Sequence, residues 1–249
     1  MTTLVVFDID GTLLDSAQVH QDAFLAALYE VGLTDIDTQW DHYEHRTDSW
    51  IFAQLYRAQH GHAPSDEDRV FFSALLQAQL RARILVAPLA EVPGAIELLR
   101  ALEAHPGYAV AYATGGMRPA SVGKMVRLGV VDALDRLATA TEHAWREHIV
   151  LEAVERAKRS TGQKDFDRII CVGDGAWDAR GAQRLGFEFL GIAADPAHFE
   201  GRCPDGNVMA SLMGADLSRP LFPAPLSPDE VWNQPFPVFA PQGPCPCLD

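Results

Sequence analysis

The hydrophobic and polar positions follow two different periods along this chain. Short continuous apolar runs rich in β-prone residues predict buried strands, and these runs are residues 3–8, 108–114, 136–140, 168–174 and 187–193. Apolar residues spaced three to four apart, often between a proline and a glycine, predict helices at 92–105, 119–130, 145–160 and 176–186. Strands that alternate with helices predict an α/β fold, a doubly wound, Rossmann-like parallel sheet with helices on both faces.

Residues 16 to about 90 break this alternation. Three helical patterns, at 17–32, 47–61 and 65–85, follow one another with no strand between them. We therefore predict a Rossmann-like core of residues 1–15 and 91–220 and a small all-helical domain of residues 16–90 over the end of its sheet. Residues 235–249 contain five prolines and no periodicity, which predicts an extended, proline-rich tail over 221–249.

The composition is that of an ordinary globular chain, but its charge is strongly negative. The net charge of −14 comes from 34 acidic and 20 basic residues, with no cluster of cations that could bind a phosphate backbone. We therefore expect neither nucleic acid nor a membrane as a partner. The apolar start lacks a basic leader and no apolar stretch approaches the ~20 residues that cross a bilayer, so we expect a cytoplasmic protein. Cys245 and Cys247 are expected to be exposed thiols of the tail.

Acidic residues lie at the end of the first predicted strand. Asp8 and Asp10 are two residues apart, and in an extended segment this spacing points both side chains to the same side. Gly11 permits a tight turn after them. Aspartate and glycine also end strands for purely structural reasons, but ligands of open parallel sheets bind beyond the carboxyl ends of the strands, and later strand ends carry matching groups.

Thr114 ends the second core strand and is followed by Gly115 and Gly116. This sequence offers a hydroxyl and accessible backbone N–H groups to an anion, although the same residues also form ordinary turns.

Two further aspartates, Asp174 and Asp178, lie at the end of a later predicted strand. Asp174 is expected to face the same crevice as Asp8 and Asp10. Carboxylates that converge there destabilise the fold unless a cation neutralises them, and a site made of oxygen ligands suits Mg²⁺.

This ordered set of motifs resembles the haloacid dehalogenase superfamily of phosphotransfer enzymes. The motifs are D-x-D-G-T at 8–12, Thr114 at a strand end, a basic residue at the head of a helix, and G-D-x-x-x-D at 173–178. The resemblance covers roughly residues 3–220, and the helical insertion matches the position of the superfamily's first cap.

The resemblance implies roles for these residues. Asp8 would be the nucleophile, and Asp10 the general acid that protonates the leaving oxygen and then deprotonates water. Asp8, Asp174 and the backbone carbonyl of Asp10 would hold Mg²⁺, with Asp178 supporting the metal site directly or through other ligands. Neighbouring anions are expected to raise the pKa of Asp10. Thr114 and Gly115 would hold the phosphoryl oxygens.

The chain departs from the superfamily at its basic residue, which is usually a lysine. Arg146 heads the helix before 168–174, whereas Lys158 and Lys164 do not, so we predict that Arg146 lies at the crevice. A solvated surface arginine is the alternative. Arg118 is a weaker candidate for contact with phosphate.

Asp10 and the positions of the lysines exclude some of the reactions that the superfamily catalyses. Asp10 argues against dehalogenation, and the absence of any lysine before Lys124 argues against phosphonate cleavage. A phosphatase acting on a small phosphorylated metabolite and a sugar phosphomutase remain. A non-catalytic binding protein of the same fold is disfavoured because every core catalytic position is filled.

Arg46 bears on the choice between these two reactions. The stretch 45–50 resembles the arginine-bearing segment of sugar phosphomutases, but the cap lysine of those enzymes is missing. Arg46 either contacts the substrate or pairs with Asp48 or Asp41 on a helix surface. We therefore predict a phosphatase, with a phosphomutase as the alternative.

Overall fold

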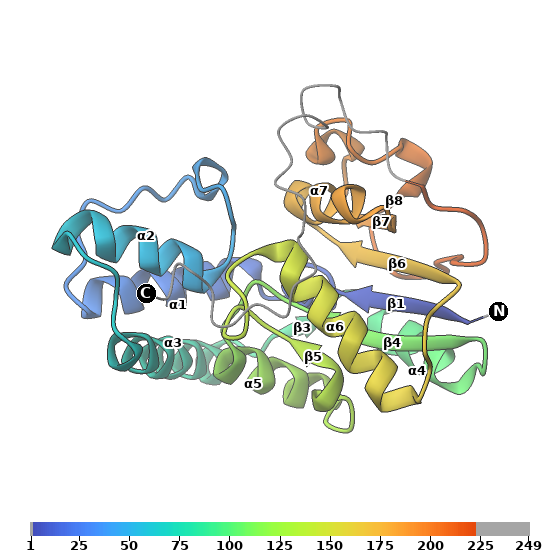
Figure 1. Ribbon diagram of the computed structural model, residues 1–249, viewed down its shortest axis with the longest axis horizontal. Coiled ribbons are helices and arrows are strands. Elements are labelled where there is room, and N and C mark those ends of the chain that lie inside the picture. The colour runs from blue at the N-terminus through green and yellow to red at the C-terminus, as the bar shows by residue number, and fades with distance from the viewer. Residues whose placement is uncertain (1, 223–249) are drawn as a thin grey trace.

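A six-stranded parallel sheet forms the centre of the molecule in a computed structural model that describes residues 2–222 (Figure 1). Its order is β5-β4-β1-β6-β7-β8. The strands are β1 (Thr3–Phe7), β4 (Tyr108–Ala113), β5 (Leu137–Ala138), β6 (Arg168–Gly173), β7 (Glu188–Ile192) and β8 (Val208–Met209). Strands after β1 first extend the sheet on one side and then, from β6 on, on the other. The point where this order reverses lies beside the end of β1, which is where sheets of this kind bind ligands.

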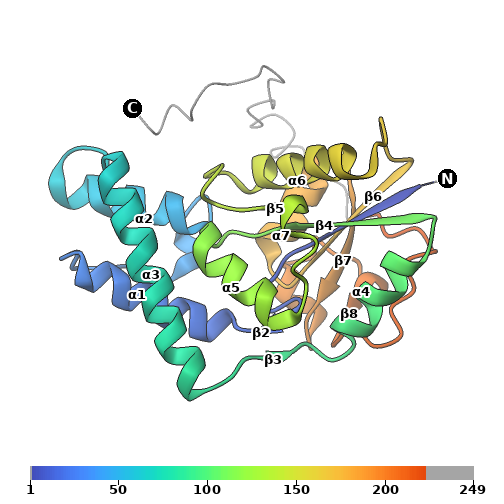
Figure 2. The same cartoon turned by 90° about the horizontal axis from the view of Figure 1, so that it is seen from below.

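Helices cover both faces of the sheet (Figure 2). One face carries α4 (Ala95–Ala104) and α5 (Arg118–Leu128), and the other carries α6 (Arg146–Thr161) and α7 (Ala176–Leu185). Successive residues of β1 point to opposite faces, as the period of a strand requires: Val5 and Phe7 belong to the first apolar cluster, Leu4 and Val6 to the second. The predicted doubly wound α/β fold is confirmed.

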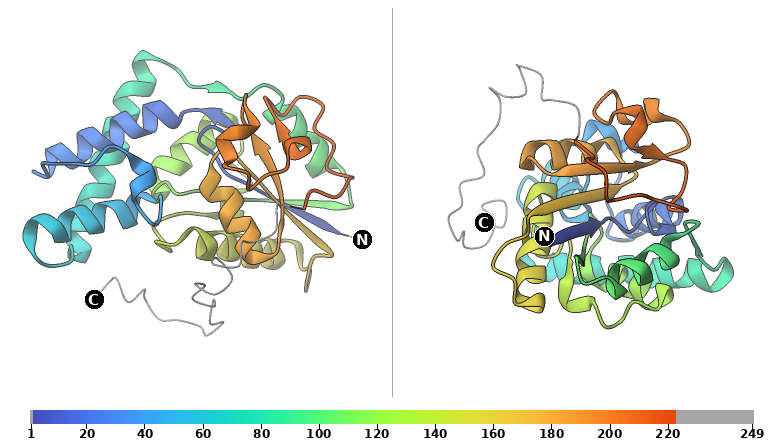
Figure 3. Two further views of the ribbon diagram at one scale, coloured as in Figure 1. Left: turned by 90° about the horizontal axis from the view of Figure 1, so that it is seen from above. Right: turned by 90° about the vertical axis from the view of Figure 1, so that its right-hand side faces the viewer.

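Three helices without an intervening strand lie at the end of the sheet toward which the strands run (Figures 1 and 3). They are α1 (Ala17–Glu30), α2 (Asp48–His60) and α3 (Asp66–Val86), with the short 3₁₀ helix η1 (Trp40–His42) between the first two. We call residues 17–86 the helical unit. Its own apolar cluster includes Met117 and Ala120, at and inside the start of α5, so the unit packs against the core through α5.

Two short strands connect the helical unit to the core. β2 (Leu14–Asp15) and β3 (Ala90–Glu91) pair antiparallel, so the entering and leaving segments of the unit lie side by side (Figure 2). None of the helices in the described part of the chain is long and apolar enough to span a membrane.

The structure differs from the sequence predictions at strands that pair with their neighbours over only two residues. The strand predicted at 136–140 is reduced to the two residues of β5, after the 3₁₀ helix η2 (Leu134–Arg136), and β8 was not predicted. Two-residue strands have no period that a sequence can show. Packing also continues past residue 220, because Leu221 is buried and its carbonyl accepts from the Phe189 amide. Residues 223–249, with Cys245 and Cys247, lie outside the described residues.

Candidate active site

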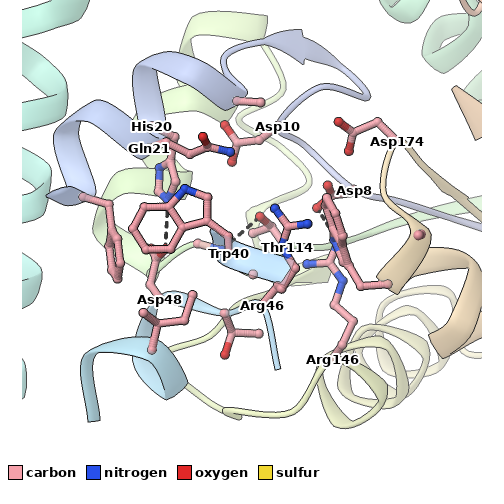
Figure 4. A pocket seen from close by; sticks show the side chains of 18 of the residues that line it. Asp8, Asp10, His20, Gln21, Trp40, Arg46, Asp48, Thr114, Arg146 and Asp174 are labelled. Atoms are coloured by element: carbon pink, nitrogen blue, oxygen red, sulfur yellow. Dashed lines mark hydrogen bonds and ion pairs between the residues drawn. The ribbon is translucent and has the colours of Figure 1, made fainter. Parts of the chain in front are cut away.

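A cavity of about 520 Å³ lies between the carboxyl ends of the strands and the helical unit (Figure 4). Each core strand that reaches it delivers a polar residue: Asp8 follows β1, Thr114 follows β4, and Asp174 follows β6. Most of the predicted site residues line this cavity, and they are Asp8, Asp10, Arg46, Thr114, Gly115, Gly116, Arg146 and Asp174.

Three carboxylates gather on the core side of the cavity. Oxygens of Asp8, Asp174 and Asp178 all lie within 4.8 Å of one another. Burial raises the pKa of Asp8 to about 7, with Arg146 opposing the shift and Asp178 and Asp10 adding to it. Burial and the neighbouring Asp8 and Asp178 likewise raise the pKa of Asp174 well above its ordinary range. The cluster therefore holds more negative charge than the protein groups around it neutralise.

The cluster suits a hard divalent cation. Its donors are all carboxylate oxygens, and Asp174 Oδ1 is buried without a hydrogen-bond partner among the described residues. An unpaired buried carboxylate oxygen is costly unless a cation meets it. The carboxylate of Asp10 is not part of this group.

Gly11 allows the backbone after β1 to approach Asp174. Its φ of 78° lies in the left-handed region, and a Cβ at this position would fall 1.9 Å from Asp174 Oδ2. A glycine is thus required here both for the turn and for the space.

Arg146 is the cation nearest to the cluster. It is the first residue of α6 and is buried, so the alternative of a solvated surface arginine is wrong. Its Nε donates to Asp178 Oδ1 at 2.8 Å, and its Nη2 lies 2.9 Å from Asp8 Oδ1. Burial opposes the charged form, but Asp178 and Asp8 outweigh it and raise the pKa of Arg146. A permanent cation therefore stands beside Asp8.

The other basic residues considered for this role, Arg118 and Lys158, form ion pairs away from the cavity. Arg118 donates to Glu142 at 2.5 Å and to the Leu137 carbonyl at 2.6 Å, and it does not line the cavity. Lys158 pairs with Glu155 and Asp165, each at 3.0 Å, on the outer end of α6.

Asp10 turns away from the carboxylate cluster (Figure 4). Both of its oxygens accept from Lys124 Nζ, at 2.5 and 2.6 Å, and Oδ1 also accepts from Ser16 Oγ at 2.5 Å. Burial raises the pKa of this carboxyl, but the charge of Lys124 and the hydrogen bonds from Lys124 and Ser16 outweigh it and lower the pKa to about 2. The expectation that neighbouring anions would raise the pKa of Asp10 is wrong, because a buried cation lies closer than they do.

Thr114 and the two glycines form the loop after β4. The Thr114 hydroxyl is buried and accepts from the Gly116 amide at 3.2 Å. A Cβ on Gly115 would fall 2.7 Å from the Arg46 carbonyl oxygen, so the helical unit approaches this loop closely.

Comparisons with known proteins assign this arrangement to a family. Residues 2–186 match the model of the haloacid dehalogenase-like hydrolase family. The chain belongs to this family. The expectation of a hydrolase that resembles the haloacid dehalogenase superfamily is therefore confirmed, and we refer to the protein below as this hydrolase.

Several solved structures share the fold of this hydrolase. CbbY from Rhodobacter sphaeroides, solved in complex with phosphate, is 18% identical with a TM-score of 0.64, over 86% of this chain and 96% of that one. A β-phosphoglucomutase from Clostridium difficile is 16% identical with a TM-score of 0.63, over 87% and 94%. A hydrolase from Pseudomonas syringae is 20% identical with a TM-score of 0.59, over 80% and 90%. None of the curated proteins matched the chain.

Arg46 of this hydrolase reaches the cavity from the helical unit. Its guanidinium carbon lies 3.5 Å from the centroid of the Trp177 ring, at the start of α7. The predicted alternative was an ion pair between Arg46 and Asp48. The carboxylate of Asp48 instead contacts His20 and the Met117 amide. The other proposed partner, Asp41, has a side chain outside the described part.

Sequence reasoning missed Lys124, His20 and Trp177. Lys124 is fully buried, on the same face of α5 as Ser121 and Met125. A lysine on the apolar face of a predicted helix is the signal that could have identified it, because such a cation requires a buried partner.

Proposed function

We propose that this hydrolase is a Mg²⁺-dependent phosphatase that acts on a small phosphorylated metabolite. The observation that carries the proposal is the position of Asp8, which lies beside the buried cation Arg146 and belongs, with Asp174 and Asp178, to a carboxylate cluster that could hold a metal ion. A nucleophile of this kind approaches an anionic phosphate only where positive charge offsets the repulsion.

Asp8, Asp174 and Asp178 would hold the metal ion, together with the backbone carbonyl of Asp10. When bound, the ion supplies positive charge that neutralises the phosphate and the carboxylates around it. Thr114 and the amide of Gly115 would hold the phosphoryl oxygens that do not react, with Gly116 leaving space beside them for the substrate.

The chain's own residues then carry out two transfers. In the first, an Asp8 oxygen attacks phosphorus, the bond from phosphorus to the leaving oxygen breaks, and Asp10 gives that oxygen a proton. In the second, water attacks the phosphoaspartate, the bond from phosphorus to Asp8 breaks, and Asp10 takes the proton from water. In the second transfer Asp10 must be ionised, and its ion-paired carboxylate meets this need. In the first transfer Asp10 must be protonated, and the negative charge of an arriving phosphate favours that protonation.

Water rather than a sugar is the acceptor in this proposal. A phosphomutase must grip a second phosphate at the far end of its substrate, which requires cations there. Among the described residues that line the cavity, the arginines are Arg46 and Arg146, and there is no lysine. Since a β-phosphoglucomutase shares the fold, the mutase remains the second candidate.

The cytoplasm remains the predicted location of the protein.

A phosphate-release screen over sugar phosphates, phosphoglycolate and nucleotides tests the proposal. We expect release of inorganic phosphate that requires Mg²⁺ and stops in a chelator, and we expect Asp8→Asn to lower turnover at least about 10³-fold. Asp132→Asn is the matched control, because Asp132 is exposed and does not line the cavity. Full activity in chelator contradicts the metal site. Conversion of a hexose 1-phosphate to the 6-phosphate without free phosphate, after priming by a bisphosphate, would replace the phosphatase with the mutase.

A further inference from the structure

A fully buried lysine lies next to the candidate site without taking part in the transfers described above. Lys124 is on α5, 0% exposed, and its Nζ lies 2.5 and 2.6 Å from the two oxygens of Asp10. Its third neighbour is His20 Nδ1 of α1, at 2.9 Å. A buried ammonium is costly unless every N–H has an acceptor, and these contacts provide one for each.

The chain of hydrogen bonds continues into the helical unit. Because Lys124 only donates, His20 Nδ1 accepts, and the imidazole then carries its proton on Nε2. Nε2 donates to Asp48 Oδ1 of α2 at 2.9 Å, and Asp48 Oδ2 accepts from the Met117 amide at 2.8 Å. Every donor in this series therefore has an acceptor.

The series also joins separately packed parts of the molecule. Asp10 follows β1 and Lys124 belongs to α5, both in the core, whereas His20 and Asp48 belong to the helical unit. The helical unit must be packed on α5 for His20 to accept from Lys124. The orientation of Lys124, and through it that of Asp10, therefore depends on this packing.

We propose that Lys124 is a positioning residue for Asp10, oriented in turn by His20 and Asp48 of the helical unit. This inference rests on the proposed phosphatase function. With Lys124 in place, the Asp10 carboxylate is fixed where it can take the proton of the attacking water, which releases phosphate and restores Asp8. Without Lys124, the partly buried carboxylate of Asp10 loses the two hydrogen bonds and the counter-charge that Lys124 provides, and it leaves this position.

Lys124→Met tests this role, with 2,4-dinitrophenyl phosphate as the substrate. Its leaving group needs no proton, so formation of the phosphoaspartate does not depend on Asp10, whereas hydrolysis does. We expect a fast release of about one dinitrophenolate per active site, followed by turnover slowed by roughly 10²-fold or more. The dependence on Mg²⁺ concentration should change by less than about twofold, since Lys124 lies outside the carboxylate cluster. Lys158→Met, on the outer end of α6, is the matched control and should behave like the wild type.

The outcomes separate a positioning role from a structural one. A variant that is merely unfolded in part loses the fast phase and the steady state in equal proportion, and that result would overturn the proposal. Unchanged steady-state turnover in a folded Lys124→Met protein would overturn it as well.

A double-mutant cycle decides the pairing even if the wild type releases no phosphate, in which case the proposed function itself fails. We expect Lys124→Met to lower the melting temperature and the added Asp10→Asn to raise it again, because the second change removes the uncompensated carboxylate. In the control cycle, Lys158→Met and Asp10→Asn should add. Additive effects of Lys124→Met and Asp10→Asn would show that Lys124 does not hold Asp10.

Discussion

Gly11 controls how closely the backbone after β1 can approach the carboxylate cluster of Asp8, Asp174 and Asp178. The residue has a left-handed φ, and a Cβ added to it would lie only 1.9 Å from Asp174 Oδ2. Gly32 has a similar φ of 83°, but a Cβ there would have no described atom within 4 Å. A substitution at Gly32 therefore tests backbone strain alone, whereas the same substitution at Gly11 adds a clash with the Asp174 side chain.

We predict that Gly11→Ala disrupts the site and that Gly32→Ala does not. Both changes should cost about 1–2 kcal/mol for the left-handed backbone. Gly11→Ala should in addition displace Asp174 and lower turnover more than about tenfold. Denaturant unfolding and phosphate release measure the two effects, and equal loss of activity in both variants would contradict this account.

The strand-end residues could be predicted from the sequence, whereas the residues that contact Asp10 could not. Asp8 and Asp174 each directly follow an apolar run, so the parallel sheet alone brings them to one edge. Lys124 and His20 meet because α3 packs on both α1 and α5, and the contact spans more than a hundred residues of sequence. No local pattern specifies that contact, and the expected pKa shift of Asp10 was wrong for this reason.

The segment that enters α2 links the helical unit to the core. Thr47 is the N-cap of α2, where its hydroxyl accepts from the Trp50 amide, and the same hydroxyl donates to the Ala144 carbonyl at 2.6 Å. Asp48 extends the link, since its amide donates to the Gly115 carbonyl at 2.8 Å. The start of one helix thus contacts two loops that surround the cavity.

We predict that Thr47→Ala lowers activity as well as stability. Ser65→Ala is the matched control, because Ser65 caps α3 through Asp68 in an exposed position. Each change should cost roughly 1 kcal/mol of unfolding free energy through the lost cap. Only Thr47→Ala should reduce kcat/KM, by several fold, because it also removes a contact between the helical unit and the core. If both variants kept full activity, the link would have no role in the site.

Helices were predictable to within a few residues, and the shortest strands were not. The apolar period fixes a long helix such as α3 from its sequence, and a capping box at Ser65 fixes its start. β5 and β8 each pair over two residues, because the extent of their pairing depends on the neighbouring strands; β5 was predicted as a longer strand, and β8 was not predicted.

The molecule as a whole is negatively charged, and three carboxylates repel one another at the site. The pKa of Asp8, about 7, lies above its ordinary value of 3.8, so the folded state binds more protons than the unfolded state between these values. The stability that this group contributes is therefore lost as the pH rises from about 4 to 7 without a metal ion. A bound cation would take over the neutralisation that protons provide at low pH.

We predict that Mg²⁺ raises the melting temperature more at about pH 7.5 than at about pH 5. At the lower pH, the proton on Asp8 competes with the ion, whereas at the higher pH this carboxylate is available. Asp174→Asn should abolish most of the response, and Asp132→Asn should retain it. Thermal unfolding with and without Mg²⁺ measures this, and an equal shift at both pH values would argue against a metal site at Asp8 and Asp174.

Covalent transfer through Asp8 is the central claim, and trapping the intermediate tests it most directly. The hydrolase is quenched in acid during turnover with its preferred phosphate ester and Mg²⁺, and the protein is then treated with borohydride, which reduces an aspartyl phosphate to homoserine. Peptide mass spectrometry locates the change. The account predicts homoserine at position 8 in the wild type and none in Asp8→Asn, with more in Lys124→Met, where hydrolysis is slowed. Turnover without homoserine at position 8, or with homoserine at another aspartate, would contradict it.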